Sequence, residues 1–185
     1  MDPKFNVSLI SSFLSAAECD ALFRRILGDP THFKHGAKTA KGAPSKKRNK
    51  TIYGELSEYK FVYMGKTVVT PIRPWSSFPE LKELERRIGA RTGQACKTCV
   101  IQIYNSGAVG IKPHRDKEMV FGDIIASISL GVPRIMRFER SGWESKDILL
   151  PKGSLCLIKP PTNDVWLHSI PCDESTSPRI SLIFR

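Results

Sequence analysis

Two stretches of the chain repeat their hydrophobic residues at the three-to-four-residue spacing of an amphipathic helix. The first ends at Gly28, and Ser15 and Glu18 near its start have the spacing of a capping box. The second is expected from Pro79 to Arg91, and Gly93 stands just beyond it. The apolar positions are Cys19, Leu22, Phe23, Ile26 and Leu27 in the first stretch and Leu81, Leu84 and Ile88 in the second. Each helix should therefore bury one face against the rest of the protein.

Shorter runs of apolar and β-branched residues fill the rest of the chain. Lys60–Met64 and Lys66–Val69 lie on either side of Gly65 and predict a hairpin. From residue 98 onward, Gly and Pro separate the runs at the spacing of an all-β sandwich or barrel. The strands expected there are Thr98–Tyr104, Ile124–Leu130, Arg134–Glu139, Asp147–Leu150, Ser154–Ile158, Val165–Ile170 and Arg179–Phe184. We expect an α+β fold, mainly β: a jelly roll (double-stranded β-helix) with the N-terminal helices packed on one sheet.

Length and cysteine content limit the organisation of the protein and its compartment. A chain of 185 residues is long enough for one core and too short for two domains. It contains no run of eighteen apolar residues, and Met1–Lys4 lacks the positive start of a secretory signal, so we expect an intracellular protein without membrane contact. The five cysteines are odd in number and irregularly spaced, which argues against a disulfide framework. Cys96 and Cys99 have the spacing of half a zinc site, but without a second pair we expect only small residues leading into a strand.

The positive net charge is more informative about the binding partner than the rest of the composition. The formal net charge is +11 and the pI is about 9.6, which favours a polyanionic partner: DNA, RNA or an acidic membrane. Much of the charge lies between Lys34 and Lys50, in the segment KHGAKTAKGAPSKKRNK, which contains no acid. Such a segment cannot bury apolar surface. We expect a mobile loop that contacts nucleic acid, with a merely solvated loop as the alternative.

Histidine and aspartate occur together at one point in the chain. His114 and Asp116 flank Arg115, and residues two apart on an extended chain point the same way. His168 lies in a later predicted strand and can supply a third ligand. Two histidines and one carboxylate on one side of an ion leave the other positions open, which suits non-haem Fe(II). A His-x-Asp triplet also arises by chance, and a lone strand histidine is more often a hydrogen-bonded core or surface residue.

Arginine recurs at even spacing in the last predicted strand. Arg179, Ser181, Ile183 and Arg185 fall on one face of that strand. Two arginines that face a sandwich interior are costly unless they meet anions. A dicarboxylate meets that need, because guanidinium groups grip carboxylates with two hydrogen bonds. The alternative is a surface strand with solvated arginines.

Taken in order, His-x-Asp, a distant His and Arg-x5-Arg at the end of a jelly roll resemble the AlkB dioxygenases. Matching blocks of the eukaryotic DNA-repair branch run through residues 45 to 185, and they are Arg48–Glu55, Phe61–Gly65, Arg73–Trp75, Gly93–Arg115 and Gly153–Pro171. The resemblance implies a single dioxygenase domain over 1–185. Its parts would be a helix and the start of the basic loop in 1–45, a nucleotide-recognition region with the second helix in 46–97, and the jelly-roll catalytic core in 98–185.

The same resemblance implies roles for the residues of the metal and co-substrate site. His114, Asp116 and His168 look like the ligands of Fe(II), with 2-oxoglutarate and O₂ as co-substrates. Arg179 looks like the partner of the far carboxylate of 2-oxoglutarate, and Tyr104 like a donor to the same group. The residues that complete this set are Arg185, near the metal-bound end, Ser181, where the family often has Asn, and Gln102, where it has the Asn of an Asn-x-Tyr element.

For the damaged base, the resemblance points to aromatic and charged residues around the metal. Phe61 and Tyr63 look like the aromatic contacts of the base, although alternate aromatics in a strand often only pack. Glu118 stands where the family places an acid near the base. Arg48 and Lys50, at the end of the basic segment, would contact phosphates. Phe33 is a candidate wedge for the vacated base stack.

The implied activity is oxidative demethylation of bases such as 1-methyladenine and 3-methylcytosine, with release of succinate, CO₂ and formaldehyde. DNA is favoured as the substrate, and an RNA demethylase on the same scaffold is an alternative. A nucleic-acid-binding module without catalysis and a dioxygenase acting on a protein or small molecule stay open as well. We expect a monomer, and the basic run Ser45–Lys50 is compatible with the nucleus.

Overall fold

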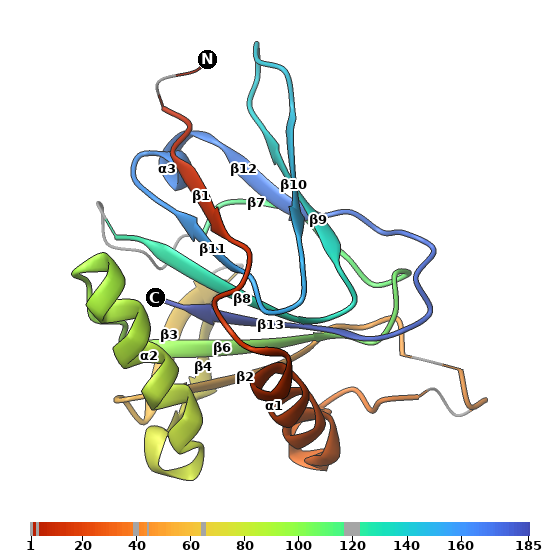
Figure 1. Ribbon diagram of the computed structural model, residues 1–185. Helices are drawn as coiled ribbons and strands as arrows, with labels where there is room; N and C mark the ends of the chain where they lie inside the picture. The colour runs from red at the N-terminus through yellow and green to blue at the C-terminus, as the bar shows by residue number, and fades with distance from the viewer. Residues whose placement is uncertain (1, 3, 39–40, 44, 64–65, 117–122) are drawn as a thin grey trace.

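Two facing β-sheets form the centre of the protein (Figure 1). The computed structural model describes residues 2, 4–38, 41–43, 45–63, 66–116 and 123–185, without the side chains at 59, 61–63, 66 and 68. The strand order is β1-β11-β8-β13-β6-β2-β5 in a seven-stranded sheet and β10-β9-β12-β7 in a four-stranded sheet, with β3-β4 as a separate pair. This arrangement confirms the predicted jelly roll and the predicted hairpin.

The bounds of the elements agree with most of the sequence expectations. The larger sheet contains β1 (Val7–Ile10), β2 (Asn49–Gly54), β5 (Arg73–Pro74), β6 (Thr98–Tyr104), β8 (Ile125–Gly131), β11 (Leu155–Ile158) and β13 (Arg179–Phe184). The smaller sheet contains β7 (Ile111–His114), β9 (Arg134–Glu139), β10 (Lys146–Leu150) and β12 (Leu167–Ile170). The hairpin is β3 (Glu58–Tyr63) with β4 (Lys66–Pro71), and the helices are α1 (Ala16–Gly28), α2 (Pro79–Thr92) and α3 (Thr162–Val165), with 3₁₀ turns at Pro30–His32 and Trp75–Ser77.

Both long helices pack on the outer face of the larger sheet (Figure 1). The capping box predicted for α1 is present, because the Ser15 side chain accepts from the Glu18 N–H and the Glu18 side chain accepts from the Ser15 N–H. Helix α2 ends at Gly93, whose φ of 74° is the left-handed conformation that favours glycine at this position. The apolar faces expected for both helices are buried in one cluster with the outer face of the sheet.

Strand β13 divides its side chains between two cores. Ile180, Leu182 and Phe184 lie in the helix-side cluster, so the alternate residues face the interior between the sheets. There Arg179 and Ser181 are buried as polar residues. The arginines of this strand therefore do face the sandwich interior, as the even spacing predicts.

Four strands, β1, β2, β5 and β7, were not predicted from the sequence, and one was placed too early. β5 has only two residues. β1 and β7 have four residues each, and β7 contains Pro113, so neither has a long apolar run. β2 begins inside the basic segment, so charge hides its start. The expected strand Val165–Ile170 begins only at Leu167, because α3 occupies Thr162–Val165. All five cysteines are free, as expected.

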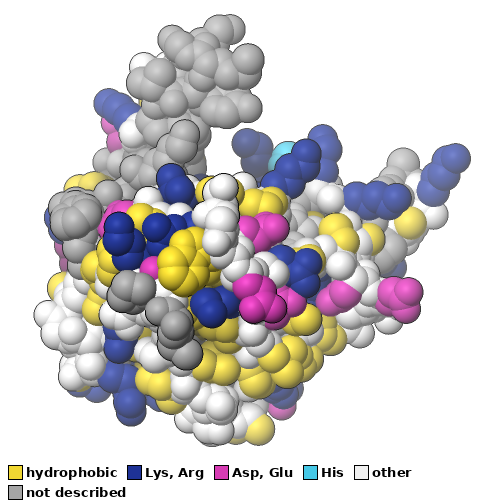
Figure 2. Space-filling model, turned by 90° about the horizontal axis from the view of Figure 1, so that it is seen from above, with side chains coloured by type: hydrophobic (Ala, Val, Ile, Leu, Met, Phe, Trp, Pro, Cys, Tyr) yellow, Lys and Arg dark blue, Asp and Glu magenta, His cyan; other side chains and the backbone are white. Residues whose placement is uncertain are grey.

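The basic segment is attached to the fold at both ends of its described part. The Ser45 N–H donates to the Ala37 carbonyl within the segment at 3.0 Å, and the Ser45 carbonyl accepts from the Asn105 side chain at 3.3 Å. Asn49 accepts from the His35 N–H at 2.8 Å and donates to the Gly36 carbonyl at 3.3 Å. Lys and Arg side chains are spread over the face shown in Figure 2, where they lie on both sides of a histidine side chain. The segment thus presents its lysines to solvent from fixed ends.

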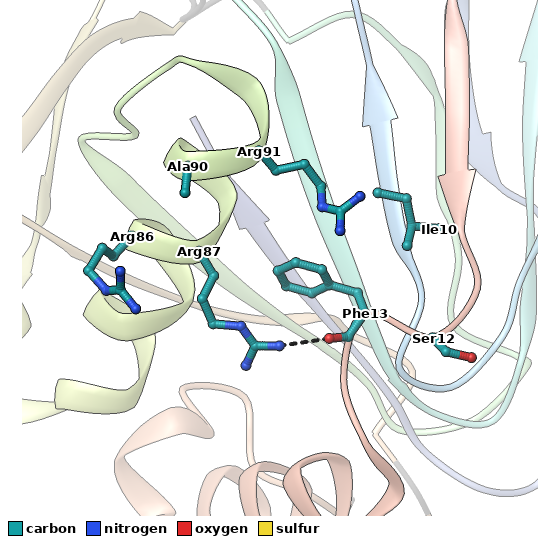
Figure 3. A pocket seen from close by; sticks show the side chains of 7 residues that line it. All are labelled: Ile10, Ser12, Phe13, Arg86, Arg87, Ala90 and Arg91. Atoms are coloured by element: carbon teal, nitrogen blue, oxygen red, sulfur yellow. Dashed lines mark hydrogen bonds between the residues drawn. The ribbon is translucent and has the colours of Figure 1, made fainter.

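The chain between β1 and α1 is fastened to helix α2. The Arg87 guanidinium donates to the Phe13 carbonyl at 2.7 Å and lies 4.8 Å from the centre of the Phe13 ring (Figure 3). Beside this contact is an open cavity of about 500 Å³ lined by Ile10, Ser12, Phe13, Arg86, Arg87, Ala90 and Arg91.

In the part of the chain that the structure describes, no helix is long and apolar enough to cross a membrane.

Candidate active site

The three predicted metal ligands meet at one edge of the smaller sheet. His114 ends β7, His168 lies in β12, and the two residues are directly paired across the antiparallel strands. Their ring centres are 4.4 Å apart. Asp116 follows β7 by two residues, and one ligand atom from each of the three side chains lies within 4.8 Å of the others. The structure therefore brings together the group that the sequence predicts.

Hydrogen bonds orient two of these ligands. The Nδ1 of His114 is 2.9 Å from the Lys112 carbonyl, which can only accept, so Nδ1 carries the proton and Nε2 presents its lone pair. That Nε2 lies 3.6 Å from Oδ1 of Asp116. The other carboxylate oxygen, Oδ2, accepts from Arg185 at 2.8 Å. Asp116 is thus left with one oxygen facing the histidines, and this is the arrangement that a metal-binding histidine and its carboxylate neighbour need.

The protonation states of the cluster suit a cation. Burial opposes ionisation of Asp116, but the contact with His114 and the charge of Arg185 outweigh it and hold its pKa well below the ordinary value. Burial lowers the pKa of His168 to about 4, so this ring is neutral at pH 7. Burial also acts to lower the pKa of His114, but the nearby Asp116 carboxylate and the bond to the Lys112 carbonyl outweigh it and raise that pKa. A carboxylate and two imidazoles that can be neutral are the donor set of a non-haem Fe(II) site.

Arg179 has the features of a residue that binds an anion. Its side chain is 0% exposed, and Nη2 donates to Ser129 Oγ at 3.0 Å. Nε and Nη1 are buried without a hydrogen-bond partner among the described residues. The guanidinium lies 5.2 Å from the Tyr104 ring centre, and the Tyr104 hydroxyl donates to Gln102 at 3.0 Å. A buried cation with two unused donors fits the carboxylate of a co-substrate.

A second buried arginine shows the contrast. Arg134 is 1% exposed and its guanidinium lies 6.0 Å from the Tyr104 ring centre, but Asp173 neutralises it at 2.7 Å. It also donates to the carbonyl of Val109 at 3.2 Å. Arg134 therefore has its anion within the protein, whereas the described residues supply none to Arg179. Ser181 takes no part in either arginine's contacts and bonds Ser127 at 2.9 Å.

The residues expected to contact the base are only partly covered by the structure. Phe61 and Tyr63 lie in β3, but their side chains are outside the described residues, as is all of Glu118. Arg48 is half-buried and donates to the Gly110 carbonyl at 3.3 Å, and Lys50 is exposed on β2. Phe33, the candidate wedge, is half-buried and packs against the helix-side core.

Three residues at the site were not predicted from the sequence. Arg134 and Ser129 lie in predicted strands, and strand parity alone places Ser129 on the interior face. Asn163 bonds the backbone of Asp116 from helix α3, and the only signal for it is its place in the block before His168. Its partner lies far away in the sequence, so no local pattern predicts the contact.

Comparisons with known proteins agree with this geometry. Residues 6–185 match the model of the 2OG-Fe(II) oxygenase superfamily. The chain is 31% identical over 185 residues to the mouse protein named DNA oxidative demethylase ALKBH2, covering 91% of this chain and 75% of that protein. The human protein of that name is also 31% identical, over 75% of this chain and 56% of its own length.

Solved structures show the same fold at low identity. The structure of OsALKBH1 matches all of this chain and 98% of its own, with a TM-score of 0.63 and 12% identity. A Pseudomonas putida prolyl-4-hydroxylase matches 98% of this chain and 92% of its own, with a TM-score of 0.58 and 14% identity. The fold, the His-Asp-His cluster and the full-length sequence match lead to one assignment: the chain belongs to the 2OG-Fe(II) oxygenase superfamily, within its AlkB family.

Proposed function

We propose that this protein removes methyl groups from N-alkylated bases in nucleic acid, with DNA as the favoured substrate. The relatives at 31% identity are named DNA oxidative demethylases. The observation that carries the proposal is the pairing of two features inside one jelly roll. These are the cluster of His114, Asp116 and His168 and the buried Arg179 without an anion.

The superfamily uses Fe(II) as cofactor with 2-oxoglutarate and O₂ as co-substrates. We assign the iron to His114, Asp116 and His168. Arg179 would hold the far carboxylate of 2-oxoglutarate, with the Tyr104 hydroxyl beside it. Arg185 would keep Oδ2 of Asp116 occupied, so that only Oδ1 is available to the ion. Gln102 and Ser181 complete the interior face of the two strands that carry these groups.

Iron with 2-oxoglutarate and O₂ supplies the oxidising power that hydroxylates an N-methyl group, giving succinate and CO₂. The hydroxymethyl group then leaves as formaldehyde and the base is restored. The protein's part is to exclude water and to fix geometry. Burial of His168 and Arg179 indicates that the interior is dry, and a dry site strengthens each electrostatic contact made there.

The substrate side of the proposal rests on charge. Exposed lysines of the basic segment, among them Lys46 and Lys47, stand on a loop whose ends are fixed by hydrogen bonds. Such a loop can bind phosphates beside the site while the base leaves the stack. A methyl group that blocks base pairing lowers the cost of that step, which favours damaged bases. Phe61, Tyr63 and Glu118 are our candidates for contact with the base.

The test is a demethylation assay on oligonucleotides that carry 1-methyladenine or 3-methylcytosine. Protein prepared without oxygen is mixed with Fe(II), 2-oxoglutarate and air, and mass spectrometry follows the loss of about 14 daltons per methyl group removed. We expect loss that requires both iron and 2-oxoglutarate and that disappears in His168→Ala.

Matched single-stranded DNA, duplex DNA and RNA versions of the oligonucleotide rank the substrates. Faster turnover of RNA than of either DNA would overturn the DNA preference. Succinate formation without methyl loss from any oligonucleotide would retain the dioxygenase and reject nucleic acid as its substrate. Binding to the oligonucleotides without succinate or methyl loss would leave only a binding module.

A further inference from the structure

Asp116 lies where no strand holds it. β7 ends at His114, so the ladder that aligns His114 with His168 stops before the third member of the cluster. A ligand on irregular backbone is held in place only by contacts from outside its own segment. The short helix α3, just before β12, supplies such contacts to Asp116.

Asn163 closes a pair of hydrogen bonds on the backbone of Asp116. The Asp116 N–H donates to Oδ1 of Asn163 at 3.0 Å, and Nδ2 of Asn163 donates to the Asp116 carbonyl at 2.9 Å. The amide side chain therefore satisfies both backbone groups of one residue, as a neighbouring strand would. The preceding residue is tied to the same helix, because Arg115 donates to the Val165 carbonyl at 3.2 Å.

Helix α3 is itself anchored in the core. Thr162 is 0% exposed, and its hydroxyl accepts from the Asn6 N–H at 2.7 Å. Trp166, at the C-terminal end of α3, is also 0% exposed and meets the Phe5 ring edge-on at 5.1 Å. Asn163 thus projects from a short segment that buried residues fix on both sides.

We propose that Asn163 is a positioning residue for the metal centre, a role that rests on the proposed iron site. It holds the backbone of Asp116 so that Oδ1 faces His114 and His168. Since α3 runs directly into β12, the same segment also sets the start of the strand that carries His168. One anchored turn therefore fixes the relative position of the carboxylate and the second histidine. Partners of this kind typically change metal affinity by about 10- to 100-fold when they are removed.

The test is a metal titration of Asn163→Ala with Mn(II), which is stable in air, followed by the electron paramagnetic resonance of the free ion. We expect the dissociation constant to rise by about 10- to 100-fold. Asp164→Ala is the matched control, because Asp164 is exposed on the same helix and does not contact Asp116. Its affinity should equal that of the unmodified protein. Thermal unfolding of the metal-free proteins, measured alongside, separates a loosened metal site from a loosened fold.

Equal affinities of Asn163→Ala and Asp164→Ala would overturn the positioning role while leaving the metal site intact. Failure of the unmodified protein to bind Mn(II) would instead reject the metal site, and with it the proposed function. Hydrogen exchange at the Asp116 amide of the unmodified, metal-free protein gives a test that requires no variant to fold. Protection of that amide supports the pair of hydrogen bonds from Asn163, whereas exchange at the rate of an unfolded chain refutes it.

Discussion

Replacing Arg179 with methionine should weaken 2-oxoglutarate binding strongly without destabilising the ligand-free protein. Methionine is of similar length and uncharged, so it fills much of the same space. In the protein alone, Arg179 is a cation without exposure, with two nitrogens that have no partner among the described residues. Its burial therefore costs free energy that only an anionic ligand recovers.

The magnitudes follow from that imbalance. Breaking a buried ion pair by removing one partner costs about 3 to 5 kcal/mol, which corresponds to about two to three and a half powers of ten in the Kd for 2-oxoglutarate. In the ligand-free protein the same change removes an uncompensated charge. We expect the free energy of unfolding of Arg179→Met to lie within about 1 kcal/mol of the unmodified protein, or above it.

Calorimetric titration with 2-oxoglutarate in the presence of Mn(II), together with thermal unfolding, measures both quantities. At 100 times its Kd the co-substrate should stabilise the unmodified protein by about 2.7 kcal/mol, or by about 5 to 10 °C for a domain of this size. Arg179→Met should show no such shift. Arg137→Met is the control, because Arg137 pairs with Asp147 at the surface and should leave 2-oxoglutarate binding unchanged.

An Arg179→Met variant that bound 2-oxoglutarate normally but had a free energy of unfolding several kcal/mol lower would refute this reasoning. It would mean that Arg179 is a structural member of the core and that the co-substrate binds elsewhere.

Three further predictions concern stability and nucleic-acid binding. Burial lowers the pKa of His32, so the unfolded chain, with a histidine pKa of about 6.5, binds a proton that the folded protein does not. The free energy of unfolding should therefore fall as the pH falls below about 6.5, by up to about 1.4 kcal/mol per pH unit. Urea unfolding at a series of pH values measures this dependence, and the free energy should change less with pH in His32→Phe. An equal dependence on pH in the two proteins would contradict the role given to His32. The double variant Lys46→Ala, Lys47→Ala should reduce the slope of log K against log salt for an oligonucleotide by about 1 to 2, and an equal slope would remove these lysines from the interface. Ser15→Ala should lower the free energy of unfolding by about 1 kcal/mol through loss of the cap, whereas Ser11→Ala, at an exposed position, should not; equal urea midpoints for the two would refute the role of the cap.

The sequence was sufficient for the parts of the fold that repeat a local pattern. Both long helices, the hairpin and, apart from β7, the strands after residue 98 follow from apolar spacing and from turn residues. β1, β2, β5 and β7 did not, for physical reasons. A four-residue strand has too few alternations to stand out, and Pro113 within β7 argues locally against a strand. Pairing with β12 overrides that local preference.

For the candidate site, too, local patterns could be predicted from the sequence and contacts between distant residues could not. The grouping of His114, Asp116 and His168 could be predicted, because the His-x-Asp triplet and the Arg-x5-Arg strand are local patterns and their order resembles that of the AlkB family. The contacts that support them could not. Asn163 reaches Asp116 across 47 positions of sequence, and the pairing of Arg134 with Asp173 joins the start of β9 to the loop between β12 and β13. Such contacts are set by packing, which no window of sequence contains.

The register of β13 explains why co-substrate binding and folding are specified together in this chain. Ile180, Leu182 and Phe184 enter the helix-side core, and the odd-numbered residues between them face the interior. A shift of the strand by one residue would exchange the two sets. The guanidinium of Arg179 would then enter an apolar core, and the apolar residues would line the metal side. Burial of the apolar residues therefore fixes the strand in the sheet and at the same time orients Arg179 and Arg185 toward the site. No further contact is needed to set the direction of the cationic face.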